Sequence, residues 1–170
     1  MRKLVAAALL AGAVLASSSP AAAEEVVIDK PNDHPSYRLE LEPHALLWFG
    51  RIDRENSAHI GAGLRANFVL ADPLIKSFNN NLAVGTGVDF FGWHGGLSAF
   101  VPVVLQWNFF LLEHLSLFPE IGLGLGVGSY HDVYLAPLLA LGGRIHIVER
   151  VALTLRVGYP GLGIGLSFFL

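Results

Sequence analysis

The sequence predicts an all-β protein, a closed eight-stranded antiparallel transmembrane β-barrel. Apolar and polar residues alternate with a period of two along most of the chain, and this pattern is typical of strands with one apolar face. Beyond residue 23 no run of 18 apolar residues occurs, so we expect no transmembrane helix. Charged residues make up 15% of the chain, which is too few to coat a soluble barrel with Lys and Glu.

Residues 1–23 have the three parts of a secretory signal peptide. Arg2 and Lys3 are followed by an apolar run, Leu4–Ala16, and by an A-x-A cleavage site that ends at Ala23. We expect this segment to be cleaved on export to the outer membrane of a Gram-negative envelope. Residues 24–36 are polar and bounded by proline. They predict a flexible periplasmic leader before a barrel over residues 37–170.

Eight segments of the mature chain have strand periodicity and are separated by turn-forming sequences. An even number of strands with short reversals keeps neighbours antiparallel and brings both chain ends to the periplasmic side. The segments are Tyr37–Gly50, His59–Leu70, Asn81–Gly92, Ser98–Leu112, Ser116–Gly128, Val133–Val148, Val151–Tyr159 and Gly161–Leu170.

Two kinds of barrel share this alternation. A lipocalin-like soluble barrel buries its aliphatic face, whereas a membrane barrel turns that face outward. The stretch EIGLGLGVGSY favours the membrane barrel, because Gly122, Gly124, Gly126 and Gly128 share a face with Glu120. The interior of an eight-stranded barrel is just wide enough for its own side chains. We therefore expect these glycines to point into a narrow lumen crowded by Arg and Glu side chains.

The face that carries the glycines also balances its charges. Its four acidic and four arginine side chains suit a closed interior, where an unpaired charge costs several kcal/mol. We expect Glu120 to lie between Gln106 and Arg144, with Arg156 as its next partner. The predicted interior network comprises Arg38, Glu40, Glu42, His44, Arg65, Asp89, Gln106, Glu120, Arg144 and Arg156.

The opposite, aliphatic face carries aromatic residues near both ends of the strands. Their positions predict two aromatic girdles that flank an apolar band, because amphipathic rings favour membrane–water interfaces. Leu123, Leu139 and Leu155 lie in the middle of this band, and we expect them to face lipid. The predicted girdle residues are Tyr37, Phe49, Phe68, Phe90, Trp107, Phe109, Tyr159 and Phe168.

The signal peptide, the eight strands and the alternating final strand GLGIGLSFFL together resemble the small outer-membrane barrels of the OmpA/OmpX type. The resemblance covers residues 37–170 and is one of pattern rather than of a specific motif. It implies insertion by the barrel-assembly machinery, which in that family reads an aromatic residue at the end of the last strand. This chain ends in Phe168, Phe169 and Leu170, so its final residue departs from the family pattern.

The polar interior predicts a structural, non-enzymatic envelope barrel, because eight strands leave little open bore. The alternatives are a small pore for ions or solutes and a lipid A-modifying enzyme. Ser, His and acidic residues in the outer connections are the right types for a hydrolase triad or a metal site, but no family spacing supports either. We predict no enzyme activity, no cofactor and no bound metal. These residues are Asp53, Glu55, Ser57, His59, His94, Ser129, His131 and Asp132.

The net charge of −3 and the lack of a basic run argue against nucleic-acid binding. We expect a monomer whose partners are outer-membrane lipid and the barrel-assembly machinery. The periplasmic connection Ala71–Asn80 carries three large apolar residues, Leu74, Ile75 and Phe78. Three roles stay open for it: packing on the lower rim of the barrel, contact with the inner leaflet, and contact with a periplasmic protein.

Overall fold

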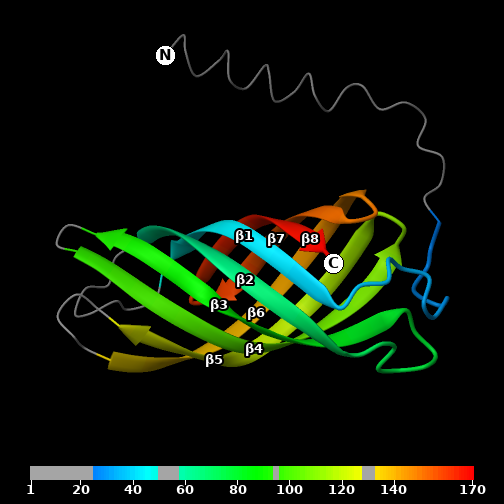
Figure 1. Cartoon of the computed structure of the whole chain (residues 1–170), viewed down its shortest axis with the longest axis horizontal. Coiled ribbons are helices and arrows are strands. Elements are labelled where there is room, and N and C mark those ends of the chain that lie inside the picture. The colour runs from blue at the N-terminus through cyan, green and yellow to red at the C-terminus, as the bar shows by residue number, and fades with distance from the viewer. Residues whose placement is uncertain (1–24, 50–57, 94–95, 128–132) are drawn as a thin grey trace, which may run out of the picture.

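The structure is a closed antiparallel barrel, which confirms the predicted fold class (Figure 1). This computed structural model describes residues 25–49, 58–93, 96–127 and 133–170. Within them, no helix is long and apolar enough to cross a membrane. The strands are β1 (Leu39–Trp48), β2 (His59–Ala71), β3 (Asn80–Trp93), β4 (Gly96–Leu112), β5 (Leu115–Val127), β6 (Val133–Val148), β7 (Val151–Tyr159) and β8 (Gly161–Phe169).

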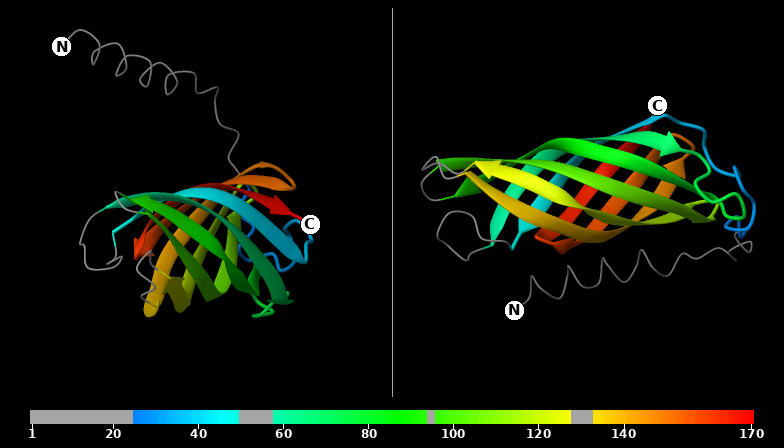
Figure 2. Two further views of the ribbon diagram at one scale, coloured as in Figure 1. Left: turned by 60° about the vertical axis from the view of Figure 1, so that its left-hand side comes forward. Right: turned by 90° about the horizontal axis from the view of Figure 1, so that it is seen from below.

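Each strand pairs with the next one in the chain, and β8 returns to pair with β1. The closing seam joins Leu41 to Phe168 and Leu47 to Leu162. We call the end of the barrel at which β1 begins and β8 ends the terminal end, and the opposite end the distal end. The even-numbered strands run toward the terminal end and the odd-numbered strands toward the distal end. Figure 2 shows the strands crossing the barrel at an angle to its axis, as closure of a sheet requires.

The period-two pattern turns the aliphatic side chains outward. Leu123, Leu139 and Leu155 are 52%, 63% and 49% exposed, whereas Glu40 and Arg144 are 0% and 1% exposed. Successive residues of a strand point to opposite faces, so each strand contributes to both surfaces. The barrel therefore has an apolar outside and a charged inside.

Aromatic layers close the interior above and below its charges. Toward the distal end, Trp48 packs edge-on against Phe91 and Phe100, with ring centroids 4.7 Å apart in both pairs. Toward the terminal end, Tyr37 packs edge-on against Phe169 at 4.8 Å. The acidic residues of β1 lie between these two layers along the strand. Side chains thus fill the interior over most of its length.

Residues 25–38, here named the N-terminal strap, lie across the terminal end of the barrel. A flexible leader was expected for residues 24–36, but the described part of this segment is bound to the strands. Val26 forms an antiparallel bridge with Leu112 at the end of β4. The neighbouring Val27 is 2% exposed and belongs to the apolar cluster at this end. Burial of this side chain in the apolar cluster stabilises the docked position.

Candidate functional site

The candidate site is the charged interior, to which six strands contribute charged side chains at inward positions. β1 supplies Glu40, Glu42 and His44 at successive inward positions, and the other strands supply one charged residue each. Among the described residues, the buried charged side chains from these strands are four carboxylates and three guanidinium groups. The contributing residues outside β1 are Arg65 of β2, Asp89 of β3, Glu120 of β5, Arg144 of β6 and Arg156 of β7.

Glu40 lies at the centre of the first ion-pair cluster. Arg144 donates to it through two atoms, Nε to Oε1 at 2.9 Å and Nη2 to Oε2 at 2.8 Å. Ser167 Oγ donates to Oε1 at 2.6 Å, and Asn67 Nδ2 donates to Oε2 at 3.1 Å. The Arg144 guanidinium also lies 4.0 Å from the centre of the Phe118 ring. This bidentate geometry is the strongest form of an arginine–carboxylate pair.

A second cluster lies toward the distal end. Arg156 donates to Glu42 through Nη1 and Nη2 at 2.8 and 2.9 Å. Its Nε atom lies 2.9 Å from Glu120 Oε2, an ion pair without hydrogen-bond alignment. Arg65 Nη1 donates to the same carboxylate oxygen at 3.1 Å. Glu120 therefore lies between two arginines from strands that are not its neighbours.

The expected pairing of Glu120 with Arg144 is wrong. Glu120 is opposite Ala140 in the register of β5 and β6, and Arg144 is opposite Ser116. Arg144 reaches Glu40 instead, so the two residues belong to different clusters. Gln106 does lie opposite Glu120, as expected. In the amide orientation that satisfies its neighbours, Gln106 donates to Glu120 Oε1 at 2.8 Å and accepts from Arg144 Nη2 at 2.7 Å, so it links the two clusters.

Arg38 was expected in the interior network, but it is exposed and lies at a bend before β1 begins. Its place at the terminal end of the barrel is taken by Tyr37, which was expected in the outer aromatic girdle and is 6% exposed. The strict alternation of β1 does not extend through this bend. Tyr37 therefore points inward and Arg38 outward, the reverse of what the alternation predicts. Burial raises the pKa of the Tyr37 hydroxyl, which accepts a hydrogen bond from Asn81 Nδ2 at 3.2 Å.

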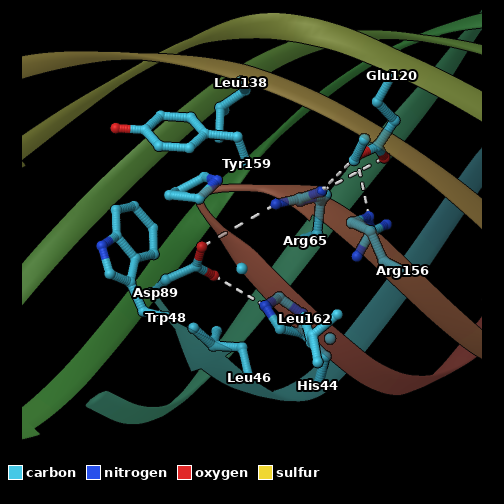
Figure 3. A pocket seen from close by; sticks show the side chains of 14 residues that line it. His44, Leu46, Trp48, Arg65, Asp89, Glu120, Leu138, Arg156, Tyr159 and Leu162 are labelled. Carbon is cyan, nitrogen blue, oxygen red and sulfur yellow. Dashed lines mark hydrogen bonds and ion pairs between the residues drawn. The ribbon is translucent and has the colours of Figure 1, made fainter. Parts of the chain in front are cut away.

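A small cavity lies at the distal side of the charged clusters (Figure 3). Its volume is about 60 Å³ and its lining includes His44, Trp48, Arg65 and Asp89. His44 Nε2 lies 2.9 Å from Asp89 Oδ1, and both side chains point toward the cavity in Figure 3. Trp48 Nε1 and Arg65 Nε have no hydrogen-bond acceptor within the described protein. A space of this size holds a few water molecules.

The interior aromatic residues were not predicted from the sequence. Phe100 and Phe118 are 1% and 0% exposed, and each has the strand parity of a charged or amide interior residue. That parity is the signal that identifies them. They also correct the explanation of the glycines: a Cβ added at Gly124 would lie 1.9 Å from the Phe100 ring, and one at Gly126 would lie 2.1 Å from the ring of Tyr134. Aromatic rings, rather than Arg and Glu side chains, occupy the space beside these two glycines. Gly128 lies outside the described residues.

The remaining girdle residues lie on the outer face. Phe49, Phe68, Phe90 and Tyr159 are between 44% and 54% exposed, and Phe168 is 37% exposed. Trp107 and Phe109 are half-buried, with ring centroids 4.6 Å apart. Exposed aromatic side chains therefore lie near both ends of the outer apolar face.

The outer-connection residues considered for catalysis or metal binding lie almost entirely outside the described residues. Asp53, Glu55, Ser57, His94, Ser129, His131 and Asp132 belong to the segments that the structure does not describe. His59 is described, and it is buried at the start of β2. In the described ranges, no group of three or more His, Cys, Asp or Glu residues is arranged to hold a metal ion.

The fold and the two faces define a small closed β-barrel whose outer face is apolar and whose interior is charged, the reverse of a soluble barrel. Among solved structures, the chain is similar to the de novo designed barrel TMB2.3, with a TM-score of 0.51 and 17% identity over 82% of this chain and 98% of that one. It is also similar to Ail, the attachment invasion locus protein of Yersinia pestis, with a TM-score of 0.51 and 11% identity over 79% of this chain and 99% of that one. These similarities confirm the fold expected from the OmpA/OmpX resemblance. No family model and no curated protein matches the chain.

Proposed function

We propose that this chain is an integral outer-membrane barrel of a Gram-negative envelope, and that its interior is a structural core rather than a pore or an active site. The observation that carries the proposal is the pairing of an apolar outer surface with an ion-paired interior. We also propose that the protein is a monomer in contact with lipid and that the barrel-assembly machinery inserts it.

The outer surface supports the membrane part of the proposal. Large aliphatic side chains along the middle of the strands are exposed, with Ile121 at 63% and Leu135 at 67%. Soluble monomers rarely expose apolar patches of more than a few hundred Å², whereas lipid-facing strands carry an apolar band. A lipocalin-like binding barrel needs an apolar interior for its ligand, and the middle of this interior is charged.

The interior supports the structural part of the proposal. Glu40, Glu42 and Glu120 are paired with arginines at hydrogen-bonding distance, and Asp89 lies 2.9 Å from His44. Such pairs stay in place because breaking one leaves an uncompensated buried charge. The cavity beside them is only about 60 Å³. Over the described part of the chain, buried ion pairs and buried aromatic rings such as Phe100 and Phe118 support a closed core rather than a path for a hydrated ion.

Refolding the full mature chain into lipid vesicles tests the proposal. A folded membrane barrel should require detergent or lipid, should run as a monomer in sedimentation, and should migrate differently on a gel before and after boiling. Planar-bilayer recordings should then show no channel openings under conditions in which a general porin conducts. A water-soluble monomer without detergent would contradict the membrane assignment, and regular unitary conductance would favour the pore. Altered lipid A acylation in cells that contain the protein, compared with cells that lack it, would favour the enzyme.

A further inference from the structure

The connection between β2 and β3, residues 72–79, carries three large apolar side chains that face solvent. Leu74, Ile75 and Phe78 are 42%, 36% and 46% exposed. This connection lies at the terminal end of the barrel, near the N-terminal strap (Figure 1). Single exposed apolar residues are common on protein surfaces, but several in one short connection mark a contact surface.

The position of Asn80, the first residue of β3, shows which side of the barrel this connection covers. Asn80 pairs with Phe109, and two residues later Leu82 pairs with Trp107. Residues at this spacing share a face of the sheet, and this face is the outer one that continues to the exposed Leu105. The Asn80 side chain thus leaves the strand on the lipid-facing side, yet the residue is 0% exposed.

The residues that bury Asn80 are those of the connection itself. Asn80 Nδ2 donates to the carbonyl oxygens of Ile75 and Phe78, both at 2.7 Å, and Oδ1 accepts from the Ile75 amide at 3.1 Å. Trp107 Nε1 donates to the same Oδ1 at 3.0 Å. A polar side chain on the apolar face is therefore satisfied by the folded-over backbone. The connection is held against the outer face of the barrel, beside Trp107.

The opposite side of the connection is fixed by the N-terminal strap. Asn79 donates its backbone amide to Ile28 O at 2.8 Å and its side-chain amide to Asp33 O at 2.7 Å. Val27 of the strap packs with the buried Phe110 and Phe169 at this end of the barrel, so the connection lies between the strap and the outer face that carries Asn80. The outer face of β2, which leads into the connection, ends in the exposed Phe68 and Leu70, at 47% and 59%.

We infer that residues 74–78 insert into the headgroup region of the phospholipid leaflet at the terminal end and anchor the barrel at that depth. The exposed apolar residues of the connection follow directly on the apolar outer face of β2, and the indole of Trp107 is hydrogen-bonded to Asn80 beside them. Membrane proteins concentrate such rings at the membrane–water interface. Lys76 is exposed between the apolar residues, and its flexible stem lets the ammonium group reach lipid phosphates. This inference rests on the proposed membrane location.

Site-directed spin labelling tests the inference, because the chain has no native cysteine. A nitroxide is attached at Ile75→Cys in the full mature chain, refolded into vesicles of phosphatidylcholine and phosphatidylglycerol. Leu139→Cys serves as the lipid-facing reference, and Glu113→Cys, exposed in the β4–β5 turn at the same end, serves as the aqueous reference. Collision rates with oxygen and with a water-soluble nickel complex are measured at each site.

The label at position 75 should collide more with oxygen than with the nickel complex, as at position 139 and opposite to position 113. Leu74→Cys provides a second site with the same expectation if the first variant refolds poorly. Nickel accessibility equal to that at position 113 would overturn the inference and leave the surface free for an aqueous protein partner. If position 139 is also accessible to nickel, the membrane assignment itself fails, so the two failures are distinguishable.

Discussion

Glu40 accepts hydrogen bonds from three strands besides its own. Its partners are Arg144, Asn67 and Ser167. Replacing Glu40 with Ala leaves the Arg144 guanidinium buried without a counter-charge, which should lower the free energy of unfolding by about 3–5 kcal/mol. Equilibrium denaturation in detergent micelles or vesicles, followed by tryptophan fluorescence, measures this loss.

A double-mutant cycle between Glu40 and Arg144 tests whether the loss of stability comes from their ion pair. Arg144→Met removes the buried charge while its side chain can still pack on Phe118, so Glu40→Ala with Arg144→Met should recover part of the loss. The corresponding cycle between Glu120 and Arg144 should show a smaller coupling, because these residues belong to different clusters. Equal couplings in the two cycles would contradict the described network.

Gly124 and Gly163 both lie on the inner face, and they differ in the space available for a side chain. At Gly124 an added Cβ would lie 1.9 Å from the Phe100 ring, whereas at Gly163 the nearest atom, Arg156 Cβ, would be 3.7 Å away. Gly124→Ala should therefore destabilise the barrel by about 1–3 kcal/mol through overpacking. Gly163→Ala should leave the free energy of unfolding nearly unchanged. The order of the two variants in a denaturation series is the measurement, and a reversed order would refute this account of the glycines.

At the scale of the element, the N-terminal strap depends on Val27. This residue is 2% exposed in the apolar cluster, while the adjacent Val26 is 54% exposed. Val27→Asp places a carboxylate in an apolar site without a partner, at a cost that exceeds what the short strap gains by docking. We expect the strap to detach while the barrel stays closed.

Limited proteolysis measures this effect. Cleavage within residues 25–38 should accelerate at least tenfold in Val27→Asp, and the barrel should keep its heat-dependent gel migration. Val26→Asp is the control and should be cleaved at the rate of the unmodified chain. Equal protection of all three proteins would show that the strap docks through its backbone hydrogen bonds alone.

Strand parity and turn chemistry predict the elements and the two faces of the barrel, because a side-chain period of two applies to every strand. The partners of individual charges were predicted only in part: Gln106 and Arg156 lie against Glu120 as expected, whereas Arg144 pairs with Glu40. Arg144 and Arg156 both reach across the lumen to β1 rather than to an adjacent strand, since a long arginine side chain spans the narrow interior. The inward position of Tyr37 was missed because the alternation stops at the bend at Arg38, which no residue type in the sequence indicates.

At the scale of the whole molecule, the apolar outer surface predicts how stability depends on depth in the bilayer. Leu139 and Ile147 of β6 are 63% and 62% exposed, but only Leu139 is near the middle of its strand. Leu139→Arg should cost about 2–4 kcal/mol, and Ile147→Arg, near the interface, about 0–1 kcal/mol. Unfolding in vesicles measures both values. Equal costs, or two negligible ones, would mean that this face does not contact the hydrocarbon region.

The strap also has a consequence for the order of events in folding. Its contacts lie on parts of the chain that are synthesised much later, since Tyr37 packs against Phe169 and the amides of Arg38 and Leu39 donate to the carbonyl of Leu170. These partners come into place only when β8 reaches β1. The bonds of the strap to β4 and to the β2–β3 connection do not need β8, but full protection of the strap against a protease requires the joining of the first and last strands. The time at which full protection appears therefore measures the rate at which the sheet closes into a barrel.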